Sequence, residues 1–173
     1  MSKLVKAWRT EDIRTQARHY VKTYILLPSG FLGLLCMLGG IGTLGYQLIA
    51  SETYTWMTFT TSSALLLLGG LCGWVQTRYH RYLFETVPGV FAARMRTAVQ
   101  RTQRKAKPEP TVPPVVHRGR TLVPVAYVAG GGLLVGSSLW AIVYGSMDAV
   151  PAMLMPWAGF YWSKLFFWRG VVN

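Results

Sequence analysis

Acidic residues are scarce in this chain, which has 6 Asp and Glu against 18 Lys and Arg in 173 residues. Charged residues of both signs make up only 14% of the sequence, whereas a soluble domain typically carries about 25%. The charges also lie in clusters that long uncharged stretches separate. This distribution excludes an ordinary soluble domain, and the 51% of hydrophobic residues excludes a disordered chain.

Cysteines and catalytic motifs are equally scarce. The 2 cysteines, Cys36 and Cys72, are too few for a disulfide-stapled secreted module. The sequence contains no Cys-x-x-Cys, His-Glu-x-x-His, Gly-x-Ser-x-Gly or P-loop pattern. Because the few carboxylates are scattered, no nucleophile, base and orienting group can be assembled from them. We therefore expect neither an enzyme nor a dedicated metal site.

What the chain does contain is long apolar tracts. A helix that crosses about 30 Å of hydrocarbon needs roughly 20 apolar residues. Four tracts meet this requirement: residues 24–50, 56–76, 121–144 and 149–168. Since backbone groups in lipid must bond within their own segment, each tract is expected to be helical. The sequence thus predicts an all-α integral membrane protein with four transmembrane helices arranged as two antiparallel hairpins.

The segments between and around these tracts define the expected domains. They are an N-terminal segment (1–23), a first hairpin (24–77), a basic loop (78–120), a second hairpin (121–169) and a short C-terminus (170–173). In the basic loop, Phe91, Met95 and Ala98 recur at helical spacing among arginines, which predicts a basic amphipathic helix with these residues against the inner leaflet or a partner. A proline-rich linker follows it.

Basic residues also predict the orientation. Six of them precede Tyr24, ten lie between the second and third tracts, and Lys164 and Arg169 complete the 18. The two short loops carry only Glu52 and Asp148. The positive-inside rule places both termini and the basic loop in the cytoplasm of a bacterial cytoplasmic membrane, or on the equivalent side of an organellar inner membrane.

The basic loop is a candidate binding surface. Its cluster comprises Arg94, Arg101, Arg104 and Lys105. Such residues next to a membrane attract anionic lipids, and an acidic patch on a partner subunit would fit equally well. The simplest alternative is that these basic residues only fix the orientation of the chain in the membrane. Nucleic acid is disfavoured, because the loop contains no recognised nucleic-acid-binding motif.

Two histidines are the candidate cofactor ligands. His19 and His80 flank the first hairpin near the same expected depth, so together they could hold a haem, or singly a chlorophyll-type pigment. Each also sits beside an arginine with no carboxylate nearby, which is typical of an interfacial polar residue. The aromatic residues Trp157 and Phe160 could line a carotenoid or quinone at a subunit interface, but packing between helices explains them more simply.

Small residues form stripes on all four predicted helices, at spacings of three and four. The glycines of these stripes are Gly33, Gly40, Gly69, Gly73, Gly132, Gly136 and Gly159. Small faces let helix backbones approach closely, and this packing drives helix association in lipid. The sequence alone does not divide these faces between the internal bundle and external partners.

Together these features favour a non-catalytic accessory or structural subunit of a larger membrane complex, with an electron-transfer or photosynthetic assembly as a possible host. It would pack against other integral membrane subunits, lipids or pigments. A small transporter or channel is the first alternative, although no tract contains a carboxylate that would mark an ion path. A haem- or pigment-binding protein that uses His19 and His80 is the second.

The predicted orientation is testable with single cysteines in a variant that lacks Cys36 and Cys72. Cysteines at Ser2 and Lys105 should react with a membrane-impermeant reagent only from the cytoplasmic side, because the basic residues hold these segments there. A cysteine at Thr53 should react only from the opposite side. Labelling of Lys105 from outside would overturn the arrangement.

Overall fold

The computed structural model describes residues 13–86, 89, 91–92, 94–95 and 122–172, and every element within these ranges is a helix. A continuous helix from Ile13 to Ile49 contains a π-helical segment, η1 (Val21–Leu26), followed by α2 (Leu27–Ile49). The chain continues with α3 (Trp56–Thr86), α5 (Leu122–Val143) and α6 (Ala149–Val172). The helical nature of all four predicted tracts is therefore confirmed.

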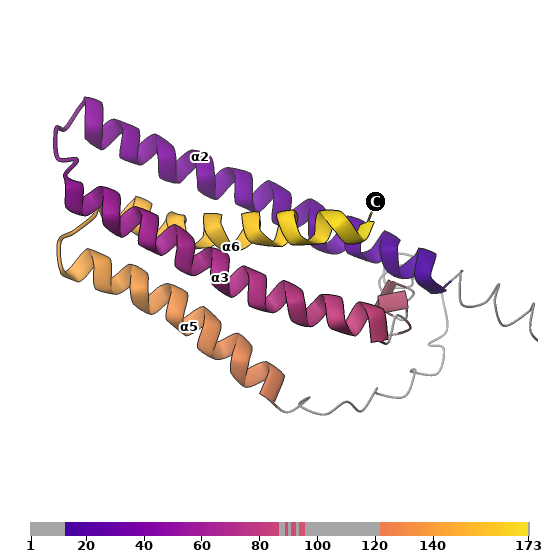
Figure 1. Cartoon of the computed structure of the whole chain (residues 1–173). Helices are drawn as coiled ribbons and strands as arrows, with labels where there is room; N and C mark the ends of the chain where they lie inside the picture. Colours follow the sequence, from indigo (N-terminus) through magenta and orange to yellow (C-terminus); the bar gives the residue numbers. More distant parts are fainter. Residues whose placement is uncertain (1–12, 87–88, 90, 93, 96–121, 173) are drawn as a thin grey trace, which may run out of the picture.

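The helices form an elongated bundle with two distinct ends. In Figure 1, α3 and α6 run in one direction, and α2 and α5 run in the other. We call the end with the connections 50–55 and 144–148 the loop end. The opposite end, where Lys22, Arg78 and Arg169 lie, is the basic end.

The first helix, Ile13–Ile49, continues through Pro28 without a break. Proline has no N–H to donate, and its ring crowds the carbonyl group four residues earlier. The turn before Pro28 widens into η1, so that the Leu27 N–H donates to the Lys22 carbonyl five residues back. This π-helical turn accommodates the proline without breaking the helix.

Local sequence determines the connections at the loop end. At the start of α3, the Thr58 N–H donates to Thr55 Oγ1 at 3.3 Å, while the Thr55 N–H donates to Thr58 Oγ1 at 3.4 Å. This reciprocal pair satisfies two N–H groups in the manner of a capping box. After α5, Gly145 adopts a φ of 64°, and the Ser146 N–H donates to the Ala141 carbonyl. This Schellman-type ending favours glycine at the position with positive φ.

The contact between α3 and α6 is unusually close. A Cβ added to Gly69 would lie 2.7 Å from the Pro156 carbonyl carbon, and one added to Gly73 would lie 3.0 Å from Ser163 Cβ. A Cβ added to Gly159 would lie 2.9 Å from the Leu66 carbonyl carbon. Only glycine leaves room for these neighbours, so backbone packs directly on backbone, as small-residue faces allow in lipid.

The opposite side of α6 packs against α2. A Cβ on Gly33 would meet Tyr161 Cβ at 3.0 Å, and one on Gly40 would meet Met155 Sδ at 3.2 Å. Helix α6 thus lies between α2 and α3, as Figure 1 shows. This differs from the expected first hairpin, in which α2 and α3 would pack on each other. A connection of 50–55 is long enough to let α6 separate them.

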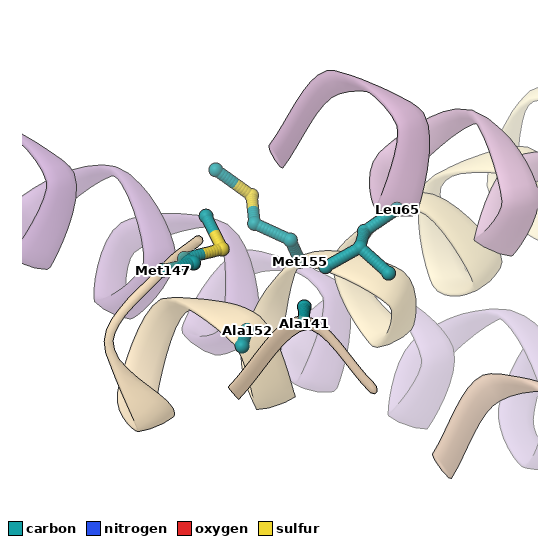
Figure 2. Close-up of a cluster of buried hydrophobic side chains, with 5 residues drawn as sticks. All are labelled: Leu65, Ala141, Met147, Ala152 and Met155. Atoms are coloured by element: carbon teal, nitrogen blue, oxygen red, sulfur yellow. The ribbon is translucent and has the colours of Figure 1, made fainter. Parts of the chain in front are cut away.

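Two apolar clusters occupy the ends of the bundle. At the loop end, Leu65, Ala141, Met147, Ala152 and Met155 come from α3, α5, the 144–148 connection and α6 (Figure 2). This cluster joins α5 to the other helices, because α3, α5, α6 and the 144–148 connection all bury side chains in it.

At the basic end, the second cluster contains Ala17, Val21, Phe91 and Trp168. Phe91 is only 2% exposed, and its ring lies 5.8 Å from Phe84 and 6.2 Å from Tyr20. The amphipathic-helix interpretation placed Phe91 against the leaflet or a partner, so for this residue it is wrong. Aromatic rings from three helical segments form a closer apolar site within the same chain.

Three helices, Ile13–Ile49, Trp56–Thr86 and Val123–Val143, are long and apolar enough to cross a membrane. This supports a membrane protein with several spans. Helix α6 has 24 residues but is not one of the three. It carries Lys164, Arg169, Pro151 and Pro156, and its position between α2 and α3 covers much of its surface with protein.

The packing of α6 gives a direct test. Gly73→Leu should reduce the free energy of unfolding by about 3 kcal/mol or more, because a side chain must displace the Phe160 and Ser163 region of α6. Gly42→Leu is the matched control, since nothing lies within 4 Å of its added Cβ. Thermal unfolding and gel filtration in mild detergent measure both variants. Equal behaviour of the two would contradict the close α3–α6 contact.

Candidate functional site: a polar cluster at the basic end

The predicted helix-packing glycines divide into two groups in the structure. Five of them, Gly33, Gly40, Gly69, Gly73 and Gly159, face neighbouring helices within the bundle. Gly132 and Gly136, on α5, have nothing within 4 Å of an added Cβ. The described part of the chain therefore leaves the small-residue face of α5 uncovered.

The two candidate cofactor histidines have different partners. His19 Nδ1 lies 3.5 Å from Thr23 Oγ1, one turn further along the same helix, and its side chain is exposed. His80, on α3, is hydrogen-bonded through Nε2 to the Tyr127 hydroxyl of α5 at 2.5 Å. In the part of the chain that the structure describes, no group of three or more His, Cys, Asp or Glu side chains could hold a metal ion.

His80 belongs to a group of polar side chains that we call the polar cluster: Gln76, His80, Arg94, Tyr127 and Lys164. The Gln76 side chain contacts the Tyr127 hydroxyl. Lys164 and Arg94 lie close enough to His80 for their charges to act on it. Residues from α3, α5, α6 and the basic loop segment thus converge at the basic end.

Lys164 is the half-buried cation of the polar cluster. Its Nζ lies 4.2 Å from the centroid of the Phe160 ring and 6.0 Å from that of Tyr161. Aromatic faces attract an ammonium group, which offsets part of the cost of removing it from water. This contact leaves the hydrogen-bonding capacity of the ammonium group open to further partners.

Next to the polar cluster, α5 stands away from the bundle. Its buried side chains within the described range 123–143 are Leu134, Ser138 and Ala141, all in the half nearer the loop end. Residues 124–129, in the other half, are all exposed, and added Cβ atoms at Gly130 and Gly131 meet nothing within 4 Å. The Tyr127–His80 hydrogen bond therefore bridges a stretch of α5 that has little other packing.

Three buried hydroxyls outside the polar cluster bond within their own helices, whereas the buried Ser163 Oγ has no hydrogen-bond partner among the described residues. Ser62, Thr77 and Ser138 each donate to a carbonyl three or four residues earlier in their own helix, at 2.7 to 2.9 Å. Gln47 Nε2 donates to Asp148 Oδ2, which ties α2 to the start of α6 at the loop end. Because these hydroxyls bond within their helices, they do not form a continuous polar path between the two ends.

The predicted lipid-binding residues are only partly described. Arg94 is exposed at the edge of the polar cluster, whereas Arg101, Arg104 and Lys105 lie outside the described residues.

Sequence reasoning singled out His80 and Arg94 separately and missed Tyr127. The sequence places His80 beyond the end of the second tract and Tyr127 inside the third, so it offers no signal that the two side chains meet.

The hydrogen bond between α3 and α5 can be tested by removing one hydroxyl. Tyr127→Phe should lower the free energy of unfolding by about 0.5–1.5 kcal/mol, the range for one net hydrogen bond. Tyr144→Phe, just past the end of α5 and 70% exposed, is the matched control and should have no measurable effect. A double-mutant cycle with His80→Phe should give a coupling of about 0.6 kcal/mol. A coupling of zero would rule out the bond.

No protein-family model, curated protein or solved structure matches this chain. The residues and their geometry therefore carry the functional argument. They describe an all-helical chain with several helices suited to a membrane, a tightly packed α2–α6–α3 unit, and an α5 helix that uses only part of its surface.

Proposed function

We propose that this protein is a non-catalytic subunit of a larger membrane complex, in which α5 packs against another integral membrane subunit. In this proposal all four long helices, α6 included, span the membrane, and the basic end faces the cytoplasm. The proposal includes no cofactor of the chain's own.

The register between α3 and α6 supports a fourth span. Gly69 faces Pro156 and Gly73 faces Phe160, so the two helices lie side by side in parallel. A helix packed along a spanning helix shares its depth, and the 24 residues of α6 are about 36 Å long at 1.5 Å per residue. Lys164 and Arg169 then lie towards the cytoplasmic surface, where long basic side chains can reach the headgroups.

The distribution of charge supports the orientation. At the basic end, the described cations include Lys22, Arg78 and Arg169. The described residues of the loop end carry Glu52 and Asp148 and no Lys or Arg. By the positive-inside rule, the basic end is cytoplasmic.

The observation that carries the proposed function is the contrast between the glycine faces. Gly69, Gly73 and Gly159 lie against backbone atoms within the chain, whereas Gly132 and Gly136 face open space. Apolar side chains next to these glycines are also exposed, with Leu139 at 51% and Trp140 at 56%. A small-residue face flanked by bulky side chains is the surface that a second transmembrane helix packs against.

The interior weighs against an autonomous transporter. Transported ions are normally coordinated near the middle of the membrane by buried ionisable or unwound backbone groups. At the middle of this bundle, α3 and α6 bring together Gly69, Gly159 and Pro156 instead. This close contact between two helix backbones suits a structural subunit, because it leaves no space for a solute between α3 and α6.

The test is co-purification in mild detergent from the native membrane, followed by identification of the proteins retained. Replacing both Gly132 and Gly136 with Leu should abolish retention of the partner, because two added side chains separate the helix backbones. The variant should still fold, since no described residue lies within 4 Å of the added Cβ atoms.

Gly42→Leu is the control, because it enlarges an equally open glycine on α2. It should retain the partner. A chain that purifies without any stoichiometric protein partner, and that carries a solute across liposomes by itself, would refute the proposal.

A further inference from the structure

The charges of the polar cluster are not balanced by the described part of the chain. Its described carboxylates are Glu52, Glu85 and Asp148. Glu85 pairs with Arg81 at 3.2 Å, and the other two lie at the loop end. Lys164 and Arg94 therefore face His80 without a carboxylate among the described residues. Because no described carboxylate neutralises the half-buried Lys164, an anion bound at the polar cluster would stabilise it.

The depth of the cluster matches that of lipid phosphate groups. Gly73 faces Phe160 in the parallel α3–α6 pair, so Lys164 lies level with Thr77. Thr77 is 21 residues beyond Trp56, the first residue of α3, which is about 32 Å along the helix. A hydrocarbon core is about 30 Å thick. With Trp56 at the outer boundary, the backbone of α6 at Lys164 lies at the inner edge of the hydrocarbon core, next to the headgroup layer.

The adjoining surface is open on the membrane side. Residues 124–129 of α5 are exposed, and the glycines at 130 and 131 lack neighbours within 4 Å of an added Cβ. Tyr127, at the centre of this stretch, is 41% exposed while its hydroxyl reaches His80. An acyl chain can therefore lie along the uncovered half of α5 with its headgroup beside Tyr127, Lys164 and Arg94.

We propose that the polar cluster is a binding site for the headgroup of one anionic phospholipid, held between α3, α5 and α6 at the basic end. Lys164 and Arg94 supply positive charge to the phosphate, and the Tyr127 hydroxyl and the His80 ring supply hydrogen-bonding groups. The acyl chains cover the half of α5 that the bundle leaves exposed. This site needs the chain to lie in a membrane but does not depend on a protein partner.

Native mass spectrometry of the full-length, delipidated protein tests the proposal by titration with phosphatidylglycerol. One phosphatidylglycerol should bind at least about tenfold more tightly than zwitterionic phosphatidylcholine. Lys164 and Arg94 should each raise the affinity for the anionic lipid by about fivefold. Lys164→Gln should weaken phosphatidylglycerol binding by about fivefold, while Lys164→Arg, which keeps the charge, should restore it.

Lys22→Gln is the matched control, because Lys22 is an exposed cation at the same end outside the polar cluster. It should leave this binding unchanged. Tyr127→Phe gives a second variant that removes one hydroxyl without altering charge, and it should also weaken binding of phosphatidylglycerol. Gel filtration confirms that each variant is folded.

The proposed lipid site would be wrong if phosphatidylglycerol and phosphatidylcholine bind equally well. It would also be wrong if Lys164→Gln and Lys22→Gln weaken phosphatidylglycerol binding equally. Inorganic phosphate provides the other discriminating probe. If millimolar phosphate displaces phosphatidylglycerol completely, the site belongs to a free anion and the lipid assignment fails. These outcomes are independent of the co-purification of a protein partner, so failure of one proposal is distinguishable from failure of the other.

Discussion

The direct contact between the backbones of α3 and α6 is the constraint on which the rest of the structure depends. Gly69, Gly73 and Gly159 remove the side chains that would otherwise hold the two helices apart. In lipid, helices gain little from apolar burial alone, so close van der Waals contact supplies much of their association energy. Two glycines at helical spacing on α3 and one on α6 therefore allow the close contact that holds this bundle together.

From this contact follows the central position of α6. With α3 on one side and the Gly33–Gly40 face of α2 on the other, α6 meets protein over much of its surface. A helix shielded in this way can carry two prolines, several aromatic residues and Lys164 without exposing them all to lipid. The same shielding lets α6 do without the long apolar stretch that makes the other three helices candidates for crossing a membrane.

Helix α5, unlike α6, is covered by the described part of the chain over only part of its length. It is anchored near the loop end through Leu134, Ser138 and Ala141, and its other half is exposed except for the Tyr127 bridge to His80. The open face of α5 at Gly132 and Gly136 and the cations Lys164 and Arg94 beside its exposed half are different surfaces, and they would bind different ligands. The first suits another helix, and the second suits an anionic headgroup. Both proposals arise because α5 completes only part of its packing within the chain.

The sequence by itself determined the helical class and the location of the long helices, because long uncharged tracts have few alternatives to a helix in lipid. It also located the stripes of small residues, since helical periodicity can be read from residue spacing. It did not determine which stripes face each other: Gly73 and Gly136 look alike in the sequence, yet one touches α6 and the other touches nothing. It likewise placed Phe91 outside the bundle, although the ring packs against Phe84 and Tyr20. Only the tertiary structure decided that α6 separates α2 from α3 and that Tyr127 meets His80, because such choices depend on how whole helix surfaces fit together across long separations in the chain.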